Sequence, residues 1–245
     1  MKAMILAAGL GTRLKPITQE IPKALIKVEG KPLIEHVINK LKIAGFNEII
    51  INVHHFPDLI IDFLKTKHFF DIHIEISDER DLLLDTGGGI KKTAGFFDDG
   101  KPFLIHNVDI LSDVDLGEVY SQHQNDCNRL ATLVVSYRET YRYLLFDEQN
   151  CLKGWVNQRT NETKPFPDLQ VDNYRKYAYS GIQVVSPKIF EQMEMDGKDK
   201  FPIMDFYLRH CYEERIVGFV PQNLKMLDIG KIDSLAKADD FFRNL

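Results

Sequence analysis

Short apolar segments alternate with helix-like segments along most of the chain, and this alternation restricts the fold more than any other feature. The apolar segments are residues 2–8, 48–53, 72–76, 102–106 and 130–137. The helix-like segments between them are residues 33–44, 58–65, 86–95 and 116–123. Strands separated by helices pair in parallel and need cover on both faces of the sheet. The pattern therefore predicts an α/β fold with a mostly parallel sheet flanked by helices.

The pattern changes after about residue 141. Residues 143–147 and 151–156 are strand-like and flank Glu148–Asn150, which predicts a β-hairpin, and residues 160–175 are polar and contain proline. We expect residues 141–176 to form a small hairpin insertion that acts as a substrate lid. The remaining pattern predicts strands at 177–185, 216–220 and 225–228 and helices at 187–193, 203–212 and 232–242. No repeat or low-complexity linker divides the 245 residues, so we expect a single domain over residues 1–245.

Composition argues against two classes of partner. The chain has 31 Lys and Arg against 36 Asp and Glu, a net charge of −5, which does not favour binding to nucleic acid or to an anionic membrane. Its apolar runs fall well short of the roughly 20 residues that span a bilayer. Three widely spaced cysteines (Cys127, Cys151 and Cys211) indicate neither a disulfide framework nor a zinc site. We expect a cytoplasmic protein that acts on small molecules, and the sequence leaves open whether it forms a homo-oligomer.

A glycine-rich turn follows the first apolar segment. Gly9 and Gly11 allow backbone N–H groups to approach phosphate oxygens, and Arg13 and Lys15 add the positive charge that a polyphosphate needs. The turn does not match the dinucleotide pattern G-x-G-x-x-G, because Leu14 occupies the third glycine position, and it lacks the G-K-[ST] of a P-loop. Taken alone, such a turn after a strand is more often a plain connection than a phosphate site.

Two more segments follow at close spacing. Pro22-Lys23-Ala24-Leu25 places a lysine after a residue of fixed φ, and Gly30-Lys31-Pro32-Leu33-Ile34 precedes the first helix. In this order the three segments, G-x-G-T-R-L-x-P, P-K-x-L and G-K-P-L-I, resemble the sugar-1-phosphate nucleotidyltransferases, also called nucleoside-diphosphate-sugar pyrophosphorylases. The resemblance implies the Rossmann-like nucleotide-diphospho-sugar transferase fold.

The resemblance extends along most of the chain. The family's second nucleotide loop is similar to residues 85–90, and its sugar-contacting strand is similar to residues 179–182. The segments that carry its two metal-binding aspartates are similar to residues 107–109 and 227–230. The pattern is most similar to that of the N-acetylmuramate 1-phosphate uridylyltransferases and mannose-1-phosphate guanylyltransferases. One residue departs from it: Val108 stands where the family usually has glycine before the metal-binding aspartate.

The resemblance assigns roles to individual residues. The implied catalytic residues are Arg13, Lys23 and Asp109. The implied nucleotide-binding residues are Ala8, Gly9, Gly11, Thr12, Thr86, Gly87, Gly88 and Asn107. The implied sugar-phosphate contacts are Lys153, Lys164 and Gly181, and the implied ligands of a Mg²⁺ cofactor are Asp109 and Asp228. The residue types agree with this chemistry, because Mg²⁺ prefers oxygen ligands and both aspartates follow strand-like runs that would end at one edge of the sheet.

These features predict a Mg²⁺-dependent enzyme whose substrates are a nucleoside triphosphate, UTP or GTP, and a sugar 1-phosphate. The sugar phosphate oxygen is already ionised near neutral pH, so the reaction needs positioning and charge stabilisation and no general base. Two alternatives stay open at this point. One is a cytidylyltransferase acting on an alcohol phosphate, and the other is a nucleotide-sensing module with impaired turnover, suggested by Val108.

Overall fold

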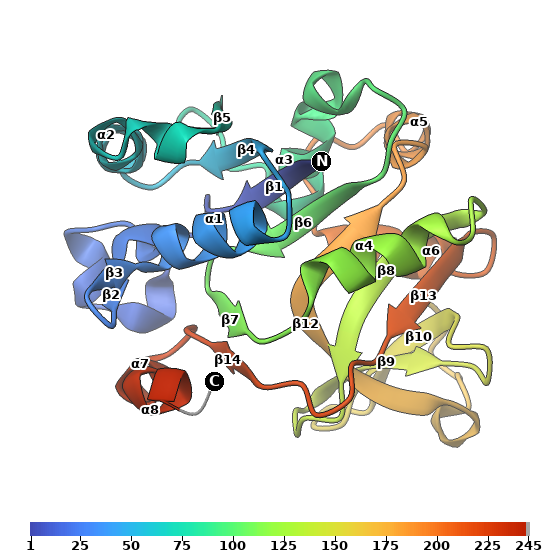
Figure 1. Ribbon diagram of the computed structural model, residues 1–245. Coiled ribbons are helices and arrows are strands. Elements are labelled where there is room, and N and C mark those ends of the chain that lie inside the picture. Colours follow the sequence, from blue (N-terminus) through green and yellow to red (C-terminus); the bar gives the residue numbers. More distant parts are fainter. Residues whose placement is uncertain (244–245) are drawn as a thin grey trace.

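A computed structural model describes residues 1–243 and places most strands in one ten-stranded sheet (Figure 1). The strand order along the main path is β11 (Glu162–Lys164), β10 (Leu152–Asn157), β9 (Arg142–Phe146), β12 (Arg175–Val185), β6 (Phe103–Asn107), β1 (Lys2–Leu6), β4 (Glu48–Val53) and β5 (His73–Asp78). Off this path, β8 (Arg129–Ser136) pairs with β12 and with β13 (Arg215–Phe219). The last two residues of the predicted domain, 244 and 245, lie outside the described residues.

The N-terminal half of the sheet is parallel. Strand β1 pairs in parallel with β4 and β6, and β4 pairs in parallel with β5. The connections between these strands carry α1 (Leu33–Ile43), α2 (Pro57–Thr66) and α3 (Asp85–Lys92). The predicted α/β alternation is confirmed, and the carboxyl ends of the parallel strands meet at one edge, where ligands of such sheets bind.

The other half of the sheet is antiparallel around β12, which pairs with β6, β8 and β9. The predicted hairpin is confirmed as β9 and β10, and the polar segment after it contributes a further strand, β11. Residues 141–176 thus extend the sheet, and their role as a lid stays a prediction. The pairing of β12 with β8 shifts register between Tyr179 and Gln183, on either side of Gly181, whose φ is +72°.

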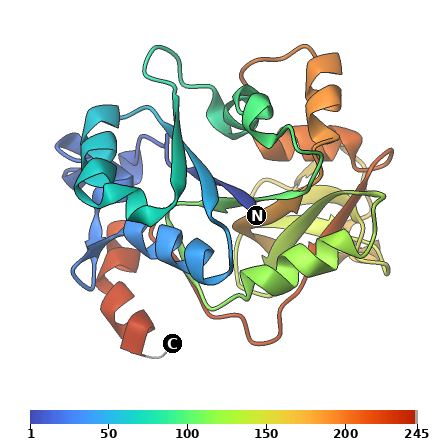
Figure 2. The same cartoon turned by 45° about the horizontal axis from the view of Figure 1, so that its top comes forward.

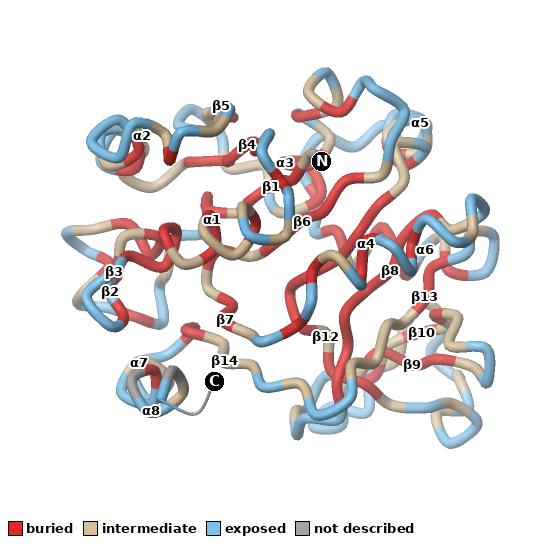
Figure 3. Tube along the Cα trace, in the orientation of Figure 1, coloured by how far each residue is buried: buried red, intermediate tan, exposed pale blue. Residues whose placement is uncertain are grey.

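Side chains of successive strand residues enter two separate cores, one on each face of the sheet. Figure 3 shows that the central strands are buried along most of their length. In β1, Ala3 and Ile5 pack in the first core and Met4 packs in the second. Helices α1, α2 and α4 (Leu116–Gln124) cover the first face, and α3, α5 (Ile189–Met195) and α6 (Ile203–His210) cover the second. None of the helices within residues 1–243 has the length and apolar content needed to cross a membrane.

A third, smaller core joins the two ends of the chain. Its buried residues include Leu14, Ile26, Leu111, Ile229 and Ala238. It brings the short pair β2 (Lys27–Val28) and β3 (Lys31–Pro32) and the short pair β7 (Ile110–Ser112) and β14 (Met226–Asp228) together with α7 (Ile232–Ala236) and α8 (Ala238–Arg243). Figures 1 and 2 both show these C-terminal helices beside the N-terminal loops. The helix predicted at 232–242 is instead two short helices.

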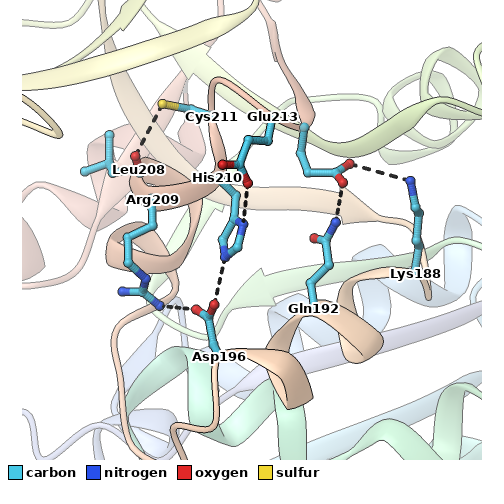
Figure 4. Close-up of polar contacts among 9 residues, drawn as sticks. Lys188, Gln192, Asp196, Leu208, Arg209, His210, Cys211 and Glu213 are labelled. Atoms are coloured by element: carbon cyan, nitrogen blue, oxygen red, sulfur yellow. Dashed lines mark hydrogen bonds and ion pairs between the residues drawn. The ribbon is translucent and has the colours of Figure 1, made fainter.

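A polar network fastens α5 to α6 (Figure 4). The carboxylate of Asp196, just after α5, accepts hydrogen bonds from Arg209 Nη2 at 2.6 Å and His210 Nε2 at 3.1 Å. Glu214 contacts Gln192 and lies 3.7 Å from Lys188 Nζ. Burial alone would raise the pKa of Asp196, but the Arg209 hydrogen bond and the neighbouring positive charges hold that pKa below its usual value.

We expect Asp196→Asn to lower the free energy of unfolding by about 1 kcal/mol at pH 7, which corresponds to a Tm decrease of about 2–4 °C. Because the folded-state pKa of Asp196 is depressed, its contribution is present above the unfolded-state pKa and is lost as the pH falls through the folded-state value. Thermal unfolding of both proteins between pH 3 and pH 7 measures this. A Tm difference that stays constant over this range would contradict it.

Candidate active site

A pocket of about 410 Å³ opens at the carboxyl edge of the parallel strands. Nine of the residues predicted from the sequence line it: Ala8, Gly9, Gly11, Thr12, Arg13, Lys23, Thr86, Asn107 and Asp109. Other lining residues are Leu6, Ala7, Leu10, Asn52, Leu83, Asp85, Val108 and Gly230. The nine predicted residues come from four separate segments of the chain, which the structure brings together in one pocket.

The glycine-rich turn has a fixed backbone. Gly11 adopts a φ of +62°, and a Cβ there would lie 2.7 Å from the Thr18 side chain. The Gly11 carbonyl accepts hydrogen bonds from Leu14 N at 2.8 Å and Thr18 Oγ1 at 2.9 Å. Glycine is needed here for both reasons, because a side chain would be strained and would also collide with Thr18. The turn holds Gly9, Thr12 and Arg13 along the pocket wall.

Asn52 is a pocket residue that sequence reasoning missed. It is the penultimate residue of β4 and is buried. Its Oδ1 accepts a hydrogen bond from Ala7 N at 2.8 Å, and its Nδ2 donates to Glu79 Oε1 at 2.8 Å. Glu79 Oε2 in turn accepts from Leu84 N at 3.1 Å. This chain of hydrogen bonds ties the glycine-rich turn to the start of α3. The one amide in the apolar run 48–53, at its carboxyl end, is the feature from which Asn52 could have been predicted.

Lys23 and Asp109 form an ion pair inside the site. Lys23 begins a 3₁₀ turn after Pro22, and its residue exposure is only 8%. Its Nζ donates to Asp109 Oδ2, and both residues line the pocket. Because so little of the Lys23 side chain is exposed, its conformation is restricted and its ammonium group stays beside the Asp109 carboxylate.

Asp228 reaches the site through strand pairing. Strand β14 is antiparallel to β7 with Asp228 opposite Ile110, and Ile229 N donates to the carbonyl of Asp109 at 2.9 Å. Asp228 Oδ1 is buried without a hydrogen-bond partner among the described residues. Burial and the negative charge of Asp109 raise the pKa of Asp228, partly offset by Lys23 and Arg13. Asp109 and Asp228 are therefore close enough to interact, and Asp228 has an oxygen without a hydrogen-bond partner among the described residues.

This donor set fits a hard divalent cation. A carboxylate oxygen that is buried and unpaired costs free energy unless a cation or a donor satisfies it. Asp109 and Asp228 would supply two oxygen ligands to a Mg²⁺ ion, whose remaining ligands would be water and substrate phosphates. No group of three or more potential metal-ligating side chains occurs in the part of the chain that is described. The site suits a metal that arrives with a phosphate-bearing substrate.

Four predicted residues lie elsewhere. Gly87 and Gly88, in the first turn of α3, direct their N–H groups at the Phe201 carbonyl at 2.8 and 3.3 Å, and a Cβ at Gly87 would lie 2.2 Å from the Phe201 ring. Lys153 pairs with Asp147 at 3.6 Å, and Lys164 with Asp205 at 3.2 Å. None of the four lines the pocket.

Gly181 lies directly behind the site. A Cβ at this position would be 3.0 Å from Asn107 Nδ2 and 2.7 Å from the Ile110 side chain. The bend of β12 at Gly181 thus leaves room for Asn107, a pocket residue.

Comparison with known proteins assigns the family. The family model described as "Nucleotidyl transferase" matches residues 2–244. The chain belongs to the nucleotidyl transferase family. One relative from Caulobacter vibrioides, named N-acetylmuramate alpha-1-phosphate uridylyltransferase, is 44% identical over 238 residues, covering 91% of this chain and 90% of the relative. Mannose-1-phosphate guanylyltransferase 1 of Arabidopsis thaliana is 29% identical and covers 82% of this chain and 55% of its own length.

The fold agrees with this family assignment. The solved structure of UDP-glucose pyrophosphorylase from Acinetobacter baumanii aligns with a TM-score of 0.77 at 19% identity, covering 97% of this chain and 91% of that chain. The predicted nucleotide-diphospho-sugar transferase fold is confirmed. In this nucleotidyl transferase the pocket lies at the edge where the glycine-rich turn, α3, β6 and β14 meet.

Because the fold disfavours the charged form of Asp228, the ionised side chain costs stability at neutral pH in the metal-free protein. We expect Asp228→Asn to raise the Tm measured in EDTA. If Asp228 is a cation ligand, as its buried and unpaired oxygen predicts, the same variant should lower turnover by about 10³-fold or more. Calorimetry and a pyrophosphate-release assay measure the two effects. Asp233→Asn, the same charge change at an exposed residue of α7, is the control and should alter neither. A decreased Tm for Asp228→Asn would contradict the expected electrostatic strain.

Proposed function

We propose that the chain transfers a uridylyl group from UTP to the phosphate of N-acetylmuramate 1-phosphate and releases pyrophosphate. The observation that carries the proposal is the cluster of Arg13, Lys23, Asp109 and Asp228 beside the glycine-rich turn. Transfer of a nucleoside monophosphate to a sugar 1-phosphate is the activity of the family. The choice of uracil and of N-acetylmuramate rests on the relative that is 44% identical over 91% of the chain.

The proposed reaction joins two anions at one phosphorus atom. An oxygen of the sugar phosphate forms a bond to the α-phosphorus of the nucleotide, and the bond from that phosphorus to the bridging oxygen of pyrophosphate breaks. Arg13 and Lys23 supply positive charge at the α-phosphate and the leaving pyrophosphate. A Mg²⁺ ion held by Asp109 and Asp228 would neutralise further phosphate charge when bound. No residue has to remove a proton from the sugar phosphate, since the nucleophilic oxygen is already ionised.

The nucleotide and the acceptor require different parts of the site. We assign Ala8, Gly9, Gly11 and Thr12 to the triphosphate, and Thr86 and Asn107 to the nucleoside, because all of them line the pocket. Gly87 and Gly88 contribute through the packing of α3. Lys153, Lys164 and Gly181 stay proposed contacts of the sugar phosphate, which the two lysines reach only if they leave Asp147 and Asp205.

The relatives favour an enzyme over the two alternatives. They are named as uridylyl- and guanylyltransferases, which favours neither a cytidylyltransferase of alcohol phosphates nor a module that only senses nucleotides. GTP with mannose 1-phosphate is the second candidate pair, supported by the Arabidopsis relative. We also propose a cytoplasmic location, because the three cysteines are widely spaced and indicate no disulfide framework.

Pyrophosphate release with four nucleoside triphosphates and a panel of sugar and alcohol phosphates tests this function. We expect the highest kcat/KM for UTP with N-acetylmuramate 1-phosphate, and loss of turnover in EDTA that added Mg²⁺ restores. Preference for GTP and mannose 1-phosphate would support the second candidate. Full turnover in EDTA would contradict the proposed cation site, and release with none of the pairs would contradict the function.

Val108 offers a test of acceptor or nucleotide selectivity. It is 4% exposed, lines the pocket and also packs in the first core. Val108→Gly removes three carbons from the wall, so we expect the preference among substrates to change by about 10- to 100-fold, with a lower Tm from the cavity. Steady-state kcat/KM over the same panel measures the preference. An unchanged ranking with only a lower Tm would show that Val108 contributes packing alone.

A further inference from the structure

A second pocket, of about 290 Å³, adjoins the first. The two pockets share Arg13 and Gly230, and Asp228 lies in the wall of the second. Gly230 allows this close approach, because a Cβ there would lie 2.7 Å from Asp228 Oδ1 and 3.0 Å from Arg13 Nη2. A molecule whose phosphate meets the nucleotide at Asp228 can therefore extend directly into the second pocket.

Two additional cations face this second pocket. Arg138 precedes β9, and Lys231 precedes α7. Arg138 Nη2 donates to the carbonyl of Tyr179 at 3.0 Å, which anchors the guanidinium and leaves most of its five donors for other partners. The second pocket also contains one carboxylate, Asp228, which we propose as a ligand of the Mg²⁺ ion.

The two cations differ from the lysines proposed for the sugar phosphate. Lys153 and Lys164 each have a carboxylate partner in the structure. Among the described residues, neither Arg138 nor Lys231 has a carboxylate within ion-pair distance, although the charge of Arg138 helps to lower the pKa of Asp228, which lines the same pocket. In a protein of net charge −5, a pocket wall with Arg13, Arg138 and Lys231 is a local excess of positive charge. Such an arrangement favours an anion.

We propose that Arg138 and Lys231 bind a carboxylate carried by the sugar, so that the enzyme selects acidic sugar 1-phosphates. The inference rests on the proposed function, since it places the sugar phosphate at Asp228. The phosphates already face Arg13, Lys23 and the cation site, which leaves Arg138 and Lys231 for a second anionic group. Half-buried Met226 and Leu227 supply apolar wall beside these cations, as a short carboxyalkyl substituent requires.

A matched pair of acceptors tests the proposal. N-acetylmuramate 1-phosphate and N-acetylglucosamine 1-phosphate differ by the lactyl ether, which carries the carboxylate. For each protein the measured quantity is the ratio of kcat/KM for the acidic acceptor to that for the neutral one. We expect Arg138→Gln and Lys231→Met each to lower this ratio by about 10- to 100-fold, mainly through a higher KM for the acidic acceptor. Arg138→Lys should keep part of the ratio because it keeps the charge.

Arg175→Gln is the matched control. Arg175 is exposed at the start of β12, contacts Asn150 at 3.4 Å and does not line either pocket. The Arg175→Gln variant removes one positive charge outside both pockets, so it should leave the ratio of kcat/KM values unchanged. An equal loss of activity on both acceptors in Arg138→Gln and Lys231→Met would mean that the two residues act on the phosphate or on the fold, and would overturn the proposal. An unchanged ratio in both variants would overturn it as well.

The failure of the proposal and the failure of the function give different results. A wild-type enzyme that uses only the neutral acceptor keeps the nucleotidyl transfer and overturns the carboxylate site. If no acceptor releases pyrophosphate, the proposed function fails, and titration calorimetry with the two sugar phosphates alone decides the site. Tighter binding of the acidic acceptor that Arg138→Gln abolishes supports the carboxylate site. Equal binding of the two overturns it.

Discussion

The pairing of β7 with β14 is the interaction on which the site depends. It joins Ile110–Ser112 to Met226–Asp228, and the hydrogen bond from Ile229 N to the Asp109 carbonyl extends it. These contacts bring two aspartates separated by more than a hundred residues of chain to one place. Without them the glycine-rich turn would face Asp109 alone, and the proposed cation would have a single carboxylate ligand although it needs several oxygen ligands.

The electrostatics of the site oppose the stability of the fold. Lys23 neutralises Asp109 in the structure, whereas Asp228 keeps a buried oxygen with no described partner and has a raised pKa. A fold selected only for stability would place a neutral residue there. The unpaired carboxylate is retained at the position where a cation and two phosphates would supply the missing interactions, as is common at functional sites.

The sequence predicted the parts of the structure that depend on local periodicity. The order of β1, α1, β4, α2, β5, α3 and β6 was predicted from the alternation of apolar and helix-like segments. The glycine-rich turn was predicted to lie at the candidate site, and it lines the pocket. Strand β11 could not be predicted, because a polar edge strand is stabilised by backbone pairing with β10 and has no apolar face of its own. Gly87 and Gly88 show a similar limit: their contact with Phe201 joins segments that are far apart in sequence, and no local pattern reveals it.

The third core, which attaches the C-terminal segment, determines how the protein loses activity on heating. The C-terminal segment that carries Asp228 is attached through a three-residue ladder and the core around Leu14, Leu111 and Ile229, while the sheet is enclosed by two larger cores. Detachment of this segment exposes far less apolar surface than global unfolding and so needs less free energy. Heating would therefore inactivate the protein while its sheet is still folded. Cooling would restore the activity, because only the C-terminal segment has to pack against the sheet again.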